Sequence, residues 1–196
     1  MPFREGQQFE VAQKQETLGH QIEFKVAEFI GGSFDCVEDI ELTENGGQND
    51  KKGIDLIITF EDGSKMAVDV TADVGSRVEE KIKSMRRSPL VGVMEERDEQ
   101  GKVAVAKSKS LVPRALIRAD IAKWEEYNIE KTDQEVIVYM PDDVRLREEK
   151  DILRQLLRQI EYFSKEDTEY KKKTESIKEM LKGALEEVEE LEKEFS

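Results

Sequence analysis

Two aspartates, Asp55 and Asp69, are the residues whose type and spacing are best suited to chemistry. Asp55 lies in the β-rich run Ile54–Phe60 and Asp69 lies in the β-rich run Lys65–Thr71. The segment Glu-Asp-Gly-Ser between the two runs predicts a β-hairpin. Aspartate is disfavoured in strands, so two of them flanked by Ile, Leu and Val indicate a site for a metal ion or a phosphate group.

The register of this hairpin decides whether the two aspartates meet. Gly63 as the third residue of a three-residue loop is typical of a type I turn with a G1 bulge, which pairs Phe60 with Ser64. Asp55 is then directly opposite Asp69, with Cβ atoms about 4.5–5.5 Å apart. Carboxylates this close repel each other unless a proton or a cation lies between them, and Mg²⁺ prefers such oxygen ligands. A two-residue turn would instead put them on opposite faces.

The order of elements around the aspartates resembles the restriction-endonuclease-like (PD-(D/E)xK) superfamily of nucleases. The similarity covers about residues 18–87, with some support to 140, through Gly-Ile-Asp-Leu-Ile and Val-Asp-Val-Thr. The resemblance implies that Asp55 and Asp69 are the two metal-binding acids of the motif. It also matches Glu23, within Glu-Phe-Lys-Val-Ala-Glu-Phe-Ile-Gly-Gly, to a glutamate of the first helix that assists them. The implied cofactor is Mg²⁺ or Mn²⁺.

The chain departs from that pattern at Thr71, which stands where the resemblance requires a lysine. In such nucleases the lysine is expected to orient or deprotonate the attacking water and to stabilise charge in the transition state. Threonine is neutral and cannot do this. Lys81 and Lys83 lie on the next predicted helix and are candidates to reach back over the site; of the two, we favour Lys81. Without a replacement the core would be catalytically silent.

Basic residues are concentrated in the middle of an acidic chain. The net charge is −14, whereas residues 81–118 contain ten basic and four acidic residues. We expect one phosphate-binding face here, on which Lys83, Arg86 and Arg87 follow the backbone of DNA. A solvated helix surface explains the charge about as well. The overall negative charge argues against a protein that coats nucleic acid indiscriminately.

Apolar periodicity and turn residues place the remaining elements of the first 140 residues. Helices are expected at 11–30, 78–87 and 113–127, and strands at 34–42, 90–94, 102–106 and 135–140, the last of them central. Two details support the helices, because Gly31–Gly32 suits a helix end and Pro113 suits a first helical position. The predicted fold class is α/β, with a small mixed sheet flanked by helices in a core spanning 1–140.

The character of the chain changes after Pro141. Leucine and isoleucine recur at helical spacing, and from Ile177 the apolar positions advance in steps of four and three, as in a coiled-coil seam. We expect a helical, coiled-coil-like extension over 141–196. Its last part, 165–196, is predicted to pack on a neighbour, either a second copy in a homodimer or a helical partner.

Composition indicates the cellular compartment in which the chain is expected. No apolar run is long enough for a membrane span, and the polar first residues predict no secretory signal. Cys36 is the only cysteine, so an internal disulfide is impossible and a reducing cytoplasm is expected.

Two functions follow from these residues. The first is a Mg²⁺- or Mn²⁺-dependent phosphodiesterase acting on DNA, in which Asp55 and Asp69 hold the metal, Glu23 assists and Lys81 replaces the missing lysine. The alternative is a catalytically inactive nuclease-like module that works in assembly or regulation through its C-terminal helices.

Overall fold

The computed structural model describes residues 18–43, 49, 52–72, 76–93, 110–120, 123–124, 128–131 and 136–194. The described helices are α1 (Leu18–Ser33), α2 (Ser76–Arg87), α4 (Asp142–Glu166) and α5 (Thr168–Glu194). The strands are β1 (Val37–Leu42), β2 (Leu56–Phe60), β3 (Lys65–Thr71), β4 (Leu90–Val93), β5 (Ser110–Arg118), β6 (Asn128–Lys131) and β7 (Val136–Tyr139).

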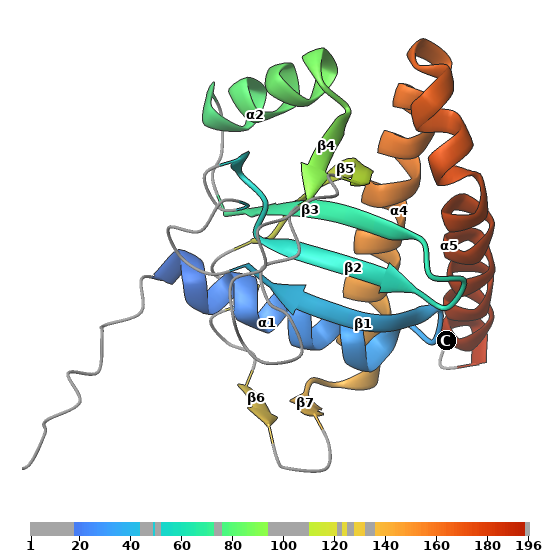
Figure 1. Cartoon of the computed structure of the whole chain (residues 1–196). Helices are drawn as coiled ribbons and strands as arrows, with labels where there is room; N and C mark the ends of the chain where they lie inside the picture. The colour runs from blue at the N-terminus through green and yellow to red at the C-terminus, as the bar shows by residue number, and fades with distance from the viewer. Residues whose placement is uncertain are drawn as a thin grey trace, which may run out of the picture.

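A five-stranded mixed sheet with strand order β1-β2-β3-β5-β4 organises the chain. Figure 1 shows α1 and α2 on opposite sides of this sheet, with α4 and α5 standing side by side across the strand direction. The predicted α/β class, with a mixed sheet flanked by helices and a helical C-terminal extension, is confirmed.

The hairpin of β2 and β3 has the predicted register. Residues 56–59 pair antiparallel with residues 65–68, and the Phe60 N–H donates to the Ser64 carbonyl at 2.9 Å. Gly63 closes the loop with φ +76°, a left-handed conformation that glycine adopts without strain. Asp55 directly precedes β2, and its N–H donates to the carbonyl of Val68 at 2.9 Å. The loop type that brings the two aspartates together is therefore confirmed.

The predicted helix at 113–127 is wrong, because Ser110–Arg118 forms strand β5. β5 runs parallel to β3 over residues 114–118, pairing Leu116 with Asp69, and antiparallel to β4 over residues 110–113. Ala115 and Ile117 are buried among the core side chains. The parallel partner lies more than forty residues away, so pairing that is distant in sequence overrides the local helical signal of Pro113.

Other boundaries differ in smaller ways. Helix α1 continues through both glycines to Ser33 instead of ending at Ile30. The strand expected to be central, β7, pairs only with β6 in a separate two-stranded sheet. Trp124 is buried as expected and meets the Phe29 ring edge-on at 5.3 Å. The helix start at 11–17, the whole strand at 102–106, and residues 121–122 and 125–127 of the predicted third helix fall outside the described residues.

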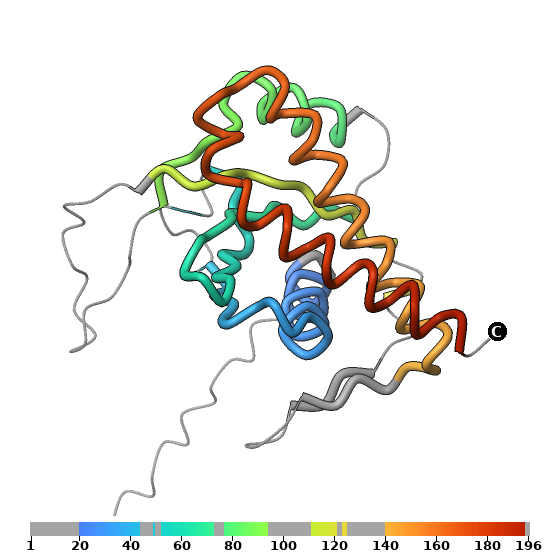
Figure 2. Tube along the Cα trace, turned by 90° about the vertical axis from the view of Figure 1, so that its right-hand side faces the viewer, coloured from blue at the N-terminus to red at the C-terminus, as the bar shows by residue number. Residues whose placement is uncertain are grey.

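One apolar core joins α1, β2, β3 and β5 to both C-terminal helices. The seam residues Ile177, Leu181 and Val188 of α5 are buried in this core, so much of the seam packs within its own chain. Helices α4 and α5 run antiparallel, as Figure 2 shows, and Arg154 of α4 forms an ion pair with Glu189 of α5 at 2.8 Å. The apolar core is thus continuous across the expected boundary at residue 140.

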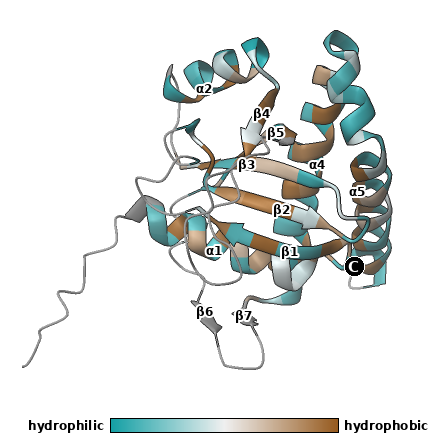
Figure 3. Ribbon diagram, viewed as in Figure 1, coloured by the Kyte–Doolittle hydropathy of each residue, from teal (hydrophilic) through white to brown (hydrophobic). Residues whose placement is uncertain are grey.

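Figure 3 shows hydrophobic residues along the sheet and hydrophilic residues on the outward sides of the helices. This distribution is that of amphipathic helices packed against a sheet. None of the helices in the described part of the chain is long and apolar enough to cross a membrane.

Candidate active site

Three elements converge on the paired aspartates. Asp69 lies on β3 with only 5 % of its surface exposed, and Asp55 directly precedes β2. Helix α2 begins five residues after β3 ends and carries Lys81 back to the strand. Nζ of Lys81 donates to Oδ1 of Asp69 at 2.6 Å. The structure therefore brings together three of the four residues that the sequence suggested for catalysis.

Asp55 is held by a backbone contact and is hard to ionise. Its Oδ2 accepts a hydrogen bond from the N–H of Val70 at 2.7 Å. Burial, the largest cause, and the negative charges of Asp69 and Glu23 together raise the pKa of Asp55 to about 7, against the Val70 N–H and Lys81, which lower it. Near neutral pH both the protonated and the ionised form of this carboxyl group are therefore populated.

The pKa of Asp69 is also raised, because burial outweighs the hydrogen bond and the positive charge of Lys81. The charge of Arg114 and a hydrogen bond with Asp55 act in the lowering direction. Two interacting carboxyl groups of this kind titrate as a pair. A divalent cation that binds between them would displace the proton that the pair retains.

Arg114 is a site residue that the sequence reasoning missed. It lies on β5, partly buried, and its Nη2 donates to the carbonyl of Lys52 at 3.3 Å. A Cβ atom added to Gly53 would lie 3.4 Å from Oδ2 of Asp69 and 3.8 Å from Nη2 of Arg114, so the backbone at this glycine lies against both groups. The helix predicted for 113–127 gives Arg114 no position beside β3. Residues 115–117 form a continuous apolar run, so periodicity gave no signal that separates a buried strand from a helix here.

Glu23 lies on α1, and its carboxylate is hydrogen-bonded to Nδ1 of His20 at 3.1 Å. Within the described residues no group of three or more His, Cys, Asp or Glu side chains is arranged to hold a metal ion. The structure thus does not gather Glu23 with the two aspartates into a three-ligand centre. The residues that fit a hard cation are Asp55 and Asp69, which suffice for an ion that keeps several waters.

The remaining predicted residues lie around this centre. Thr71, at the position of the motif lysine, is buried, and its carbonyl accepts from the N–H of Ala119 at 2.9 Å. Lys83, Arg86 and Arg87 are all exposed on α2. They therefore present positive charge to solvent on the helix that supplies Lys81.

No family model, curated protein or solved structure matches the chain. The fold and the site define an α/β protein with a mixed five-stranded sheet and a carboxyl pair, buried Asp69 and partly buried Asp55, beside a lysine. The similarity to restriction-endonuclease-like proteins stays a prediction.

Proposed function

We propose that this chain is a divalent-metal-dependent phosphodiesterase that acts on DNA. The observation that carries the proposal is the 2.6 Å contact between Lys81 and Asp69, beside a second, partly buried carboxyl group whose pKa is raised to about 7. Strongly shifted carboxyl pKa values beside a charged partner are frequent in active sites.

The carboxyl pair suits a hard cation because both groups offer oxygen ligands. Their pKa values are raised, so the positive charge nearby does not fully stabilise the ionised forms. Bound Mg²⁺ or Mn²⁺ would supply Lewis-acid stabilisation of the phosphate oxygens. Asp55 and Asp69 would hold the ion, and Glu23 would act on Asp55 through its charge.

Lys81 would position the attacking water and offset negative charge that develops on the phosphorus centre. Its side chain is 34 % exposed, so the ammonium group can face both Asp69 and a substrate in solvent. Arg114 adds a second positive charge beside Asp69. Lys83 and Arg87 would contact the phosphate backbone from the same helix, α2.

A catalytically silent core is the second candidate, and one observation favours it. Asp55 already accepts the Val70 N–H and Asp69 already accepts the Lys81 ammonium group, so the cluster is satisfied without a ligand. Assembly through the C-terminal helices, including a homodimer through 165–196, would have to use surface outside the buried seam. Leu191, 42 % exposed on α5, lies on such a surface.

Cleavage of plasmid, linear and branched DNA with Mg²⁺ or Mn²⁺ tests the proposal. We expect cutting that stops with EDTA and falls at least about a hundredfold in Asp69→Asn. The matched control is Asp39→Asn, an exposed strand aspartate on β1, which should cut normally. A folded protein that cuts nothing with either metal would support the silent core instead.

A further inference from the structure

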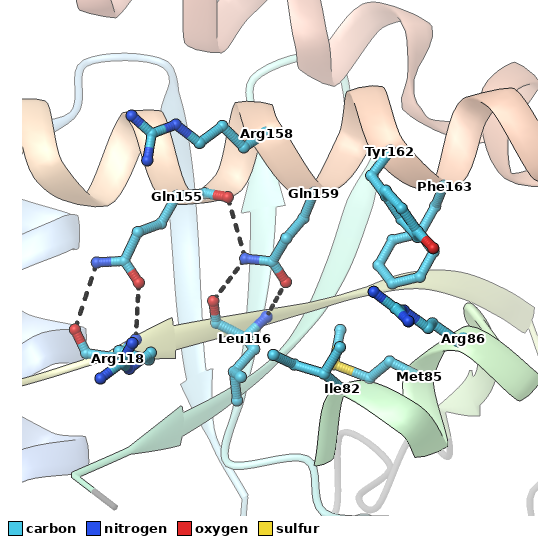
Figure 4. A pocket seen from close by; sticks show the side chains of 10 residues that line it. All are labelled: Ile82, Met85, Arg86, Leu116, Arg118, Gln155, Arg158, Gln159, Tyr162 and Phe163. Carbon is cyan, nitrogen blue, oxygen red and sulfur yellow. Dashed lines mark hydrogen bonds between the residues drawn. The ribbon is translucent and has the colours of Figure 1, made fainter. Parts of the chain in front are cut away.

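A pocket of about 360 Å³ lies between α2, β5 and α4. Figure 4 shows its lining. Its apolar surface comes from Ile82 and Met85 of α2, Leu116 of β5 and Phe163 of α4. The volume falls in the range of small-ligand sites, which are mostly apolar with a few polar groups that orient the ligand.

Three arginines provide the charge of this pocket: Arg86 from α2, Arg118 from β5 and Arg158 from α4. All three are exposed, and no Asp or Glu is among the lining residues. The whole chain carries a net charge of −14, whereas the lining of this pocket has three guanidinium groups and no carboxylate and is therefore locally positive. Such groups recognise phosphate and carboxylate oxygens through paired hydrogen bonds.

The polar amides of the pocket are already engaged. Gln159 of α4 accepts the Leu116 N–H at 2.8 Å and donates to the Leu116 carbonyl at 2.7 Å, as the dashed lines in Figure 4 mark. Gln155 makes the same pair of bonds to the backbone of Arg118. Recognition of a polar ligand therefore falls to the arginines, because the glutamines hold α4 to the edge of β5.

An aromatic surface completes the pocket. The guanidinium group of Arg86 lies over the Tyr162 ring, 5.0 Å from its centroid. Stacked arginine and tyrosine side chains are surfaces on which nucleobases pack. An apolar floor, a flat aromatic wall and several guanidinium groups suit a ligand that has a flat body and a phosphate.

We propose that this pocket binds a nucleoside monophosphate unit, with the base against Tyr162 and the apolar floor and the phosphate on Arg118 and Arg158. The unit can be a free nucleotide, or an unpaired nucleotide of a strand that lies on the neighbouring carboxyl pair. Leu116 is paired with Asp69 across β5 and β3, and Ile82 follows Lys81, so the pocket adjoins that site. Only the second source rests on the proposed phosphodiesterase function.

Isothermal titration of the full chain in EDTA tests binding without cleavage. The probes are AMP, adenosine, inorganic phosphate and a short 5′-phosphorylated single strand. We expect AMP to bind at least about tenfold more tightly than adenosine or phosphate, because it alone uses both surfaces. A strand that binds more tightly than AMP assigns the pocket to an unpaired nucleotide of a polymer, and the reverse order assigns it to a free nucleotide.

Variants locate the binding. Arg118→Gln and Arg158→Gln should each weaken the tighter of the two nucleotide probes about tenfold or more, since each removes a charge-assisted hydrogen bond. Gln155 bonds the backbone of Arg118, so the first variant keeps the contact between α4 and β5. The control is Arg147→Gln, another exposed arginine of α4 that lies outside the pocket, and this variant should bind normally.

Three results would overturn the proposal: no binding of any probe in the millimolar range, phosphate binding as tight as that of AMP, or equal losses in Arg147→Gln and Arg158→Gln. Asp69→Asn should leave AMP binding unchanged. A protein that fails to cleave DNA but binds AMP in this pattern therefore separates the two proposals.

Discussion

Nζ of Lys81 lies 2.6 Å from Oδ1 of Asp69, although the two residues are on different elements and twelve positions apart. Helix α2 thereby brings an ammonium group to the strand on which Thr71 stands where the predicted resemblance to those nucleases would require a lysine. The lysine that the resemblance predicts at position 71 is absent, and this contact makes Lys81 the candidate to perform its role.

Lys81→Met should lower metal-dependent DNA cleavage about a hundredfold to a thousandfold, because the charge beside the reacting phosphate is lost. Lys193→Met, an exposed lysine of α5 that the proposal gives no role, is the control and should stay within about twofold. Rates on a linear duplex under single-turnover conditions provide the comparison.

A second variant, which places a lysine at position 71, tests the same role. If Lys81 performs the role of the motif lysine, Thr71→Lys in the Lys81→Met background should recover part of the lost rate. Equal rates in Lys81→Met and Lys193→Met would contradict a specific role for Lys81.

Asp55→Asn should make the free energy of unfolding less dependent on pH. The folded protein holds the Asp55 proton with a pKa of about 7, against 3.8 for an ordinary aspartate, so this stabilising contribution is complete below about pH 4 and is lost as the pH rises through 7. The uncharged Asn variant avoids this loss. Its free energy of unfolding should therefore rise by about 1–3 kcal/mol relative to that of wild type as the pH increases from 5 to 8.

Urea denaturation of both proteins at pH 5 and pH 8 measures that difference. Asp39→Asn on β1 serves as the control, because its carboxylate is exposed. A gain that is the same at both pH values, or larger at pH 5, would contradict the burial of Asp55 as its cause.

Binding of Mg²⁺ or Mn²⁺ should strengthen as the pH rises from 6 to 8, because the ion competes with the proton held by Asp55 and Asp69. Calorimetry in buffers of different ionisation enthalpy should detect release of up to about one proton per metal ion at pH 6. Affinity that is constant over this range, without proton release, would place the metal elsewhere.

Gln159→Ala should destabilise the fold by about 2–4 kcal/mol, because the N–H and the carbonyl of buried Leu116 both lose their partner. Gln155→Ala is the matched comparison. It removes the same two bonds from Arg118, which is exposed, so water can replace them and the cost should be below about 1 kcal/mol. Equal losses of unfolding free energy in urea would show that burial of the β5 edge does not matter.

The hairpin and its two aspartates were predictable because their geometry is local. A glycine at the third loop position selects the loop, and the loop sets which residues of β2 and β3 face each other. The amphipathic helices α2, α4 and α5 were predictable for the same reason, since their apolar residues recur within a few positions. The proposed role of Lys81 followed from its position on the helix after β3.

Strand β5 and the residues it carries were decided only by the tertiary structure. Its parallel pairing with β3 joins residues about 47 positions apart, and no local pattern specifies such a partner. Arg114 enters the candidate site, and Arg118 enters the pocket, because that pairing forms. The glutamines of α4 likewise acquire their role from an edge of β5 that only the folded sheet creates. Local turn and helix chemistry determined the carboxyl pair, whereas contacts between distant segments determined most of what surrounds it.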